Sequence, residues 1–306
     1  MSPILVAAAL LASTAPTGPT PGHPQPLPVE LVENRFILIP QLDGGRVVHL
    51  YSDTGGGHTI LSPELISALG LPVELRDAGP EAPPLTGWPR WAPNASIPPP
   101  KERVLVMPLT QLGPGLDGFV GQDWFAGRTW TFDYPGKRLL LRAGGDLPSG
   151  PRIPFHLPKP GPETAAFGRI TIEVDGTPLD VLFDTGATTE LGPEAVAKVG
   201  DGRAPQRATS FMKAAVFDRW RKAHPDWPVV EKAEARTGAD MIRVPSIVVA
   251  GQKVGPVWFT RRPDKAFDEF MSSMMDAPVV GALGGSGLRY FRITVDYARG
   301  VAVFER

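Results

Sequence analysis

Two aspartates stand in closely similar surroundings, and each is followed by threonine and glycine. Asp53-Thr54-Gly55 follows the segment VVHLYS, and Asp184-Thr185-Gly186 follows PLDVLF. Both preceding segments are apolar and strand-like, so each aspartate is expected at the end of a rigid strand. Two carboxyl groups about 3 Å apart cannot both ionise, and such a pair keeps one proton. One member can then act as a base towards water while the other acts as an acid.

The triplets belong to longer stretches that repeat in the same order. Each triplet is preceded by a strand-like segment and an Asp-Gly turn. It is followed by a short helical segment, two apolar residues with a glycine, and a closing pair of strands. We therefore interpret the chain as a duplication in which each half supplies half of one catalytic centre. The matching segments are 33–39 with Asp43-Gly44 and 168–174 with Asp175-Gly176, then Phe119-Val120-Gly121 and Val279-Val280-Gly281.

The predicted fold is mainly β, with two homologous β-barrel-like lobes and a cleft between them. A chain of 306 residues suffices for two such units, and its 34 glycines and 36 prolines favour many turns over long helices. We expect the N-terminal lobe over 29–142, a Gly- and Pro-rich linker over 143–153 and the C-terminal lobe over 154–306. The second lobe carries an insert with apolar residues at helical spacing: Phe267, Phe270, Met271, Met274 and Met275, and more weakly Met212, Val216 and Trp220.

The N-terminal segment carries a compartment signal. Residues 3–12 form an apolar run, and Ser13-Thr14-Ala15 offers small residues for cleavage. The run is too short to span a bilayer, and no Lys or Arg precedes it, so a disordered apolar start is the alternative. We expect a signal peptide over 1–15, a Pro-rich linker over 16–28, and export to the periplasm or the medium.

Composition excludes several classes of function. A net charge of −1 gives no electrostatic case for binding nucleic acid or an anionic membrane. The absence of Cys excludes disulfides, thiol catalysis and Cys-ligated metal. The five histidines do not show metal-ligand spacing, and Gly55-Gly56-Gly57 lacks the Gly-Lys-Ser/Thr ending of a phosphate loop. We therefore expect neither a metal nor a cofactor.

On its paired triplets and paired glycine segments, the chain from about residue 28 onward resembles the aspartic proteases of the pepsin/retropepsin fold. It is similar to a bilobal, single-chain form of bacterial retropepsin-like enzymes, because Ala187 follows the second triplet where pepsins usually have serine. The resemblance implies that Asp53 and Asp184 are the catalytic pair. It also implies that Thr54 and Thr185 interlock beneath them.

The resemblance further assigns residues around the pair. Gly55 and Gly186 would allow a tight turn and a close approach of two backbones. Gly56 and Ala187 would line the cleft floor and contact substrate. Pepsins close the cleft with a flap tyrosine, but no tyrosine stands at that place here. The segment 84–91 occupies the position of the flap, and its Trp88 or Trp91 is the candidate to close over a substrate.

The predicted function is therefore an aspartic-type endopeptidase that cleaves peptides or proteins with a water held between Asp53 and Asp184. Both half-sites lie on one chain, so we expect a monomer with internal pseudo-twofold symmetry. The first alternative is a catalytically silent peptide-binding module of the same fold. The second is a structural periplasmic protein whose lobes only pack together.

Overall fold

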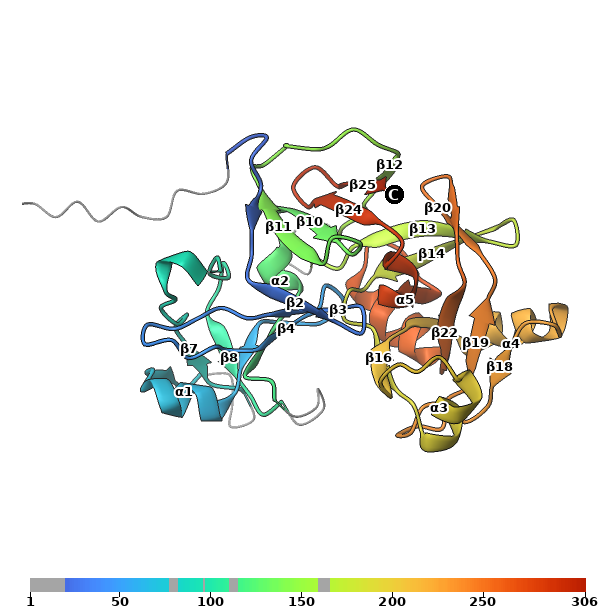
Figure 1. Ribbon diagram of the computed structural model, residues 1–306, viewed down its shortest axis with the longest axis horizontal. Helices are drawn as coiled ribbons and strands as arrows, with labels where there is room; N and C mark the ends of the chain where they lie inside the picture. The colour runs from blue at the N-terminus through green and yellow to red at the C-terminus, as the bar shows by residue number, and fades with distance from the viewer. Residues whose placement is uncertain (1–19, 77–81, 96, 110–114, 159–165) are drawn as a thin grey trace, which may run out of the picture.

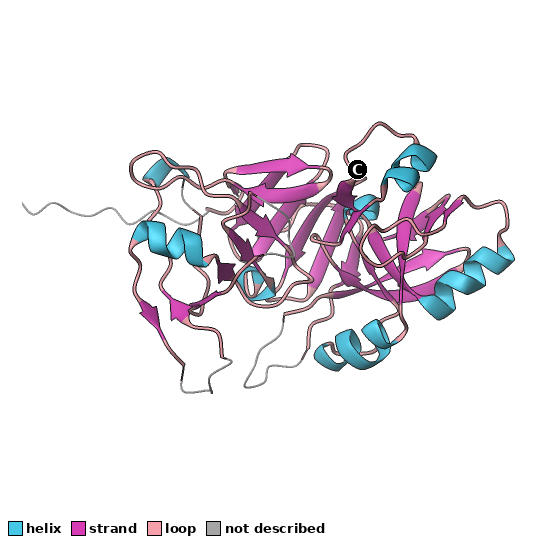
Figure 2. Ribbon diagram, turned by 90° about the horizontal axis from the view of Figure 1, so that it is seen from below, coloured by secondary structure: helices cyan, strands magenta, loops and turns pink. Residues whose placement is uncertain are grey.

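Two lobes joined by a shared sheet make up the protein (Figure 1). The computed structural model describes residues 20–76, 82–95, 97–109, 115–158 and 166–306. Strands hold 38% of the residues and helices 17%, so the predicted mainly β fold is confirmed. Figure 2 shows the strands filling the centre of the molecule and most of the helices lying towards its periphery.

The first lobe is built on an eight-stranded sheet. Its centre is a parallel pair, which crosses the lobe and ends at the first Asp-Thr-Gly. In spatial order the strands are β2 (Val29–Val32), β3 (Arg35–Leu38), β4 (Leu50–Ser52), β9 (Gly118–Val120), β5 (Ile60–Leu61), β8 (Val104–Val106), β7 (Leu85–Thr86) and β6 (Val73–Glu74).

The second lobe repeats this plan in a nine-stranded sheet. The order is β18 (Val229–Val230), β19 (Met241–Val244), β22 (Val257–Arg262), β17 (Ser210–Lys213), β23 (Gly281–Leu283), β14 (Thr177–Phe183), β13 (Arg169–Val174), β20 (Ile247–Val249) and β21 (Gln252–Val254). The parallel pair β14–β23 matches β4–β9 of the first lobe. Beside the sheet, β15 (Thr188–Glu190) pairs with β16 (Gln206–Ala208).

A short helix follows each triplet, and both helices begin and end in the same way. Proline occupies the start of α1 (Pro63–Leu69) and of α3 (Pro193–Val199), where its missing N–H costs nothing. Gly70 and Gly200 end these helices at φ 60°, a left-handed conformation that favours glycine. The other helical segments are η1 (Pro93–Ala95), α2 (Gln122–Phe125), α4 (Ala214–Ala223), η2 (Ala266–Phe270), η3 (Met271–Met274) and α5 (Gly285–Leu288).

A six-stranded sheet unites the two halves. Its order is β1 (Gln25–Pro26), β11 (Arg138–Arg142), β10 (Thr129–Asp133), β24 (Arg292–Asp296), β25 (Val301–Glu305) and β12 (Arg152–Pro154). The closing strands of the two halves, β10 and β24, pair antiparallel at its centre. There the hydroxyls of Thr131 and Thr294 lie 2.7 Å apart. The two lobes are therefore held by backbone hydrogen bonds as well as by side-chain packing.

Segments that we predicted as linkers take part in this sheet. Residues 25–26 of the Pro-rich stretch pair with β11, and Leu27 beside them is buried. β12 spans the end of the predicted interlobe linker and pairs with β25. Beneath the sheet, one apolar core runs from lobe to lobe, with the rings of Phe132 and Phe183 packed 5.6 Å apart.

The helical insert of the second lobe differs in part from its prediction. Met212 lies in strand β17, and helix α4 begins two residues later with Val216 and Trp220 on its buried face. The strand forms because β17 is hydrogen-bonded between β22 and β23, and this pairing overrides helical spacing. In the other predicted stripe, Phe267, Phe270, Met271 and Met274 lie in helical segments, whereas Met275 follows η3 in an extended conformation. The stripe packs onto the lobe through Phe267 and Met275, but Phe270 is exposed.

Candidate active site

Both aspartates stand at the end of a central strand, in equivalent positions. The backbone N–H of Asp53 donates to Val120 O at 3.1 Å, and that of Asp184 donates to Leu283 O at 3.1 Å. In each lobe this bond continues the parallel pairing of two buried strands. The side chains therefore extend from rigid elements that reach the interface between the lobes.

The strand register corrects one prediction about the second half. Leu50 pairs with Gly118, and Val181 pairs with Gly281, so Gly281 is the counterpart of Gly118. The second copy of Phe119-Val120-Gly121 is therefore Ala282-Leu283-Gly284, three residues later than we predicted. Gly121 and Gly284 are both closely packed. A Cβ on Gly121 would lie 1.9 Å from Gly57 O, and one on Gly284 would lie 2.0 Å from Thr209 O.

Thr54 and Thr185 interlock below the aspartates. The Thr54 hydroxyl donates to Phe183 O at 2.7 Å, and the Thr185 hydroxyl donates to Ser52 O at 3.4 Å. Each hydroxyl also accepts the other threonine's backbone N–H, at 3.0 Å for Thr54 Oγ1 and 3.2 Å for Thr185 Oγ1. Both residues are buried, so these four bonds join the two loops without competition from water.

The two glycines of the triplets lie against the opposite aspartates. Gly55 N–H donates to Asp53 Oδ1 at 2.8 Å, and Gly186 N–H donates to Asp184 Oδ1 at 3.0 Å. A Cβ on Gly55 would lie 2.5 Å from Asp184 Cγ, and one on Gly186 would lie 2.1 Å from Asp53 Cγ. Only glycine lets the two loops approach this closely.

The carboxyl groups of Asp53 and Asp184 are hydrogen-bonded to each other. Burial raises the pKa of both groups, and the charge of Asp53 raises the pKa of Asp184 further. Backbone N–H groups of the triplets oppose the rise by stabilising the ionised form. The pair therefore holds one proton at a pH where ordinary aspartates are ionised, and it can offer an acid and a base together.

A cavity of about 570 Å³ opens beside this pair. The first lobe contributes Arg35, Tyr51 and Asp53 to its lining. This volume falls in the range of pockets that bind drug-sized ligands. The second lobe supplies the rest of the lining: Asp184, Gly186, Ala187, Thr188, Thr189, Glu190, Gln206, Phe211, Glu234, Arg236 and Arg262.

Tyr51 bridges the lobes at this cavity, a role that we did not predict. Its hydroxyl lies 2.5 Å from Gly186 O and 2.6 Å from Thr188 Oγ1. Burial raises the pKa of the Tyr51 hydroxyl well above its usual range, so the group is a proton donor. The sequence did indicate this position, because side chains two residues apart in a strand lie on the same face, and Tyr51 precedes Asp53 by two residues.

An ion pair forms part of the wall of the second lobe. Arg262 donates to both carboxylate oxygens of Glu234, at 2.8 and 2.9 Å, and its guanidinium lies 4.1 Å from the centre of the Phe211 ring. Burial opposes the ionisation of Glu234, but Arg262 and Thr237 outweigh it and the pKa of Glu234 falls below its usual value. The pair is thus charged at neutral pH.

Of the three predicted contact residues, Ala187 lies in the cavity lining, whereas Gly56 and Trp88 do not. Ala187 lines the cavity, and Gly56 lies beside Asp53, where a Cβ would be 3.0 Å from Oδ2. Trp88 instead packs against the core of the first lobe, with its ring 5.6 Å from that of Trp91. It lies beyond strand β7, which pairs antiparallel with β6. Residues 77–81, between these strands in the sequence, lie outside the described residues.

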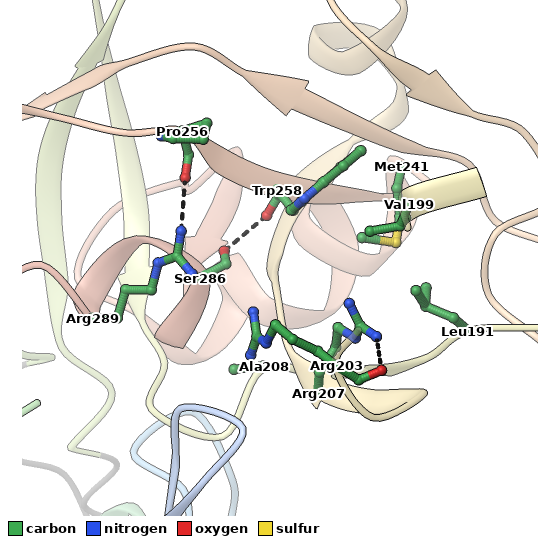
Figure 3. Close-up of a pocket in the computed structure, with 10 residues that line it drawn as sticks. All are labelled: Leu191, Val199, Arg203, Arg207, Ala208, Met241, Pro256, Trp258, Ser286 and Arg289. Atoms are coloured by element: carbon green, nitrogen blue, oxygen red, sulfur yellow. Dashed lines mark hydrogen bonds between the residues drawn. The ribbon is translucent and has the colours of Figure 1, made fainter. Parts of the chain in front are cut away.

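A second cavity in the C-terminal lobe is too small for a substrate (Figure 3). Its volume is about 10 Å³, which is the space of a single water molecule. Polar groups around it are largely satisfied internally: Ser286 donates to Trp258 O at 2.9 Å, and Arg207 donates to Arg203 O at 2.7 Å. This small cavity is therefore no candidate for a substrate site.

The histidines beside the first triplet face carboxylates singly. His58 Nδ1 lies 3.5 Å from Asp123 Oδ2, and His49 Nδ1 lies 3.9 Å from Asp117 Oδ2. Within the described ranges, no group of three His, Cys, Asp or Glu side chains could hold a metal ion. In the same part of the chain, no helix has the length and apolarity to cross a membrane.

Comparison with solved structures finds this fold in an aspartic proteinase from Irpex lacteus. The TM-score is 0.51 at 10% sequence identity, and the match covers 92% of this chain and 96% of the other. No protein-family model and no curated protein sequence matches the chain. At this identity the likeness shows a pepsin-like fold.

Proposed function

We propose that the protein is an aspartic-type endopeptidase whose catalytic pair is Asp53 and Asp184. One observation carries the proposal: the two carboxyl groups are hydrogen-bonded to each other where the two lobes meet, beside a cavity of about 570 Å³. A structural role alone does not account for two acids in contact, because a carboxylate that is removed from water without a compensating partner is unfavourable.

The reaction would proceed without a covalent intermediate. The ionised carboxylate removes a proton from a bound water as the water oxygen attacks the carbonyl carbon of the peptide. The protonated carboxyl donates its proton to the carbonyl oxygen, giving a neutral tetrahedral diol. Collapse of the diol breaks the C–N bond, while the amide nitrogen takes a proton from one carboxyl and a diol hydroxyl returns a proton to the pair.

The surrounding hydrogen bonds support this chemistry by positioning the acids. The four bonds that Thr54 and Thr185 make across the lobes, two to each other and two to Phe183 O and Ser52 O, hold the two loops at a fixed separation. The N–H groups of Gly55 and Gly186 hold one oxygen of each carboxyl. The remaining oxygens can then face a water and a peptide carbonyl with little rearrangement.

We further propose a single-chain enzyme of the bacterial retropepsin-like kind, exported to the periplasm or the medium and acting on peptides or proteins. Ala187, which follows the second triplet, supports the assignment to the retropepsin-like kind. The apolar run over 3–12 supports export. Because both halves of the pair lie on one chain, a monomer contains the whole site.

The second candidate is a peptide-binding module of the same fold without activity. One observation favours it. The hydroxyls of Tyr51 and Thr188 together occupy Gly186 O, a backbone acceptor beside Asp184, and leave it no lone pair for a peptide N–H. A site with this acceptor occupied could hold peptides without placing the carbonyl against the catalytic pair.

The test is cleavage of a diverse peptide pool from acid to mildly basic pH, with product masses identifying the cut bonds. Asp53→Asn and Asp184→Asn are compared with the parent and with Asp43→Asn, which makes the same change at an exposed turn. We expect the first two variants to fold and to lose nearly all activity, while Asp43→Asn remains active. Binding of peptides by a parent that cuts none would instead support the silent module.

A further inference from the structure

Arg35 is the buried cation in the cavity that lacks a carboxylate partner. It begins strand β3, is 7% exposed and lines the cavity next to Tyr51 and Asp53. Its Nε makes a long contact of 3.4 Å with Val32 O. Among the residues that the structure describes, no Asp or Glu forms an ion pair with it.

This arrangement departs from the rest of the molecule. Three other arginines in the described ranges are equally buried, and each holds a carboxylate. These pairs are Arg142 with Asp146 at 2.9 Å, Arg169 with Asp276 at 2.7 Å, and Arg207 with Asp201 at 2.7 Å. A buried charge without a partner is unfavourable, so a group that supplied the missing carboxylate would be bound at this place.

The other charges of the lining do not satisfy Arg35. Glu234 is held by both nitrogens of Arg262. Glu190 is exposed at the end of β15, where solvent screens its charge. The carboxyls of the catalytic pair bind each other and their own loops.

The position of Arg35 relates it to the cleaved bond. Ile37 pairs with Tyr51 and Leu38 pairs with Leu50 between antiparallel strands β3 and β4. Continued by two residues, this register sets Arg35 across from Asp53, on the same face of the sheet. A peptide whose scissile carbonyl lies at the catalytic pair would therefore bring a neighbouring side chain to the guanidinium.

We propose that Arg35 is a specificity-determining residue that binds the carboxylate of an aspartate or glutamate side chain next to the scissile bond. The planar guanidinium has parallel N–H groups that match the two oxygens of a carboxylate. Tyr51 and Thr188 beside it add uncharged polar surface that tolerates such a side chain. The substrate class is thus acidic peptides, and this inference rests on the proposed peptidase function.

The experiment uses peptides that differ by Glu against Gln at each position around an identified cut bond, with both termini blocked. For the parent we expect kcat/KM to favour Glu by about 10- to 100-fold at one position, the range of a charge-assisted pair that is largely desolvated. Arg35→Gln should remove this preference, and Arg35→Glu should reverse it towards Lys. Arg236→Gln, at an exposed arginine of the same cavity, is the control and should keep it.

Two further measurements separate the possible outcomes. Calorimetric binding of the same peptides to Asp184→Asn reports recognition without cleavage, and the salt dependence of the parent's Glu-to-Gln ratio needs no Arg35 variant to fold. If no peptide of the pool is cut but its Glu-containing members bind more tightly than their Gln counterparts, the peptidase proposal fails and the binding role of Arg35 stands. Cleavage without discrimination, or discrimination kept by a folded Arg35→Gln, would overturn the role of Arg35. Dependence on an unblocked C-terminus would overturn the side-chain assignment.

Discussion

The hydroxyl of Tyr51 in the first lobe is bound to the carbonyl oxygen of Gly186 in the second, 2.5 Å away and beside the carboxyl groups of Asp53 and Asp184. Thr188 donates to the same oxygen at 3.0 Å, so both lone pairs of this carbonyl are engaged. The interaction links the lobes and occupies a backbone acceptor at the wall of the cavity. The interaction can be tested by replacing Tyr51 with Phe, which removes only the hydroxyl group.

Tyr51→Phe should weaken folding and strengthen peptide binding. Loss of one buried hydrogen bond is expected to lower the free energy of unfolding by about 1 kcal/mol. The freed acceptor on Gly186 should lower KM for peptides. The control is Tyr290→Phe. It removes a hydroxyl that donates to Pro256 O at 2.7 Å, and Tyr290 is not part of the cavity lining. Denaturant unfolding and steady-state kinetics check both parts, and an equal change of KM in the two variants would contradict the role of Tyr51.

The two threonines should contribute unequally. Thr54→Ala removes a hydrogen bond of 2.7 Å to the opposite lobe, whereas Thr185→Ala removes one of 3.4 Å. Each change also leaves a buried N–H without its acceptor, so we expect a loss of about 1–3 kcal/mol, larger for Thr54. Thr54→Ser and Thr185→Ser keep the hydroxyl and should be milder. Urea unfolding of the four variants decides the order, and equal losses would show that the bond lengths do not govern stability here.

Substitution of the triplet glycines should abolish activity through the opposite half of the chain. In Gly186→Ala the new methyl would overlap the carboxyl of Asp53, and in Gly55→Ala it would overlap that of Asp184. Displacing either acid should reduce kcat by more than about 100-fold, because the reacting groups lose alignment. Gly57→Ala, next to the first triplet, meets open space and should retain activity. Measuring kcat in folded variants tests this, and an active Gly186→Ala would refute the tight approach.

The carboxyl groups of Asp53 and Asp184 should make stability depend on pH. Folding raises the pKa of both carboxyls, so the stability linked to their protonation is present at low pH and is lost as pH rises through the folded-state values. Asp184→Asn removes the second ionisation. The variant should therefore be more stable than the parent near pH 7, and the difference should shrink towards pH 4. Melting temperatures measured across this range test the sign, and a difference that grows on acidification would contradict it.

The fold could be predicted from the sequence because the same segments recur in the same order in both halves. Which strand residues pair with each other could not be predicted, because strand pairing depends on the three-dimensional arrangement. The duplicated triplets predicted two related lobes, and the pepsin-like fold confirmed them. Sequence could not choose between Gly281 and Gly284, because both follow two apolar residues and only the strand register separates them. Arg35 and Tyr51 were missed for a similar reason, since their places follow from strand pairing and lobe packing. Trp88 lies in the segment where a flap was predicted, but strand β7 ends before it at Thr86. Its partly buried indole packs against the core of the first lobe.

The shared six-stranded sheet makes each half of the chain the obligate companion of the other. Strands β10 and β24 sit at its centre, and a half alone would present one of them as a bare edge. Open edges of this kind recruit other chains. The two halves also supply different parts of one cavity: the first contributes Arg35, and the second contributes the ion pair of Glu234 with Arg262.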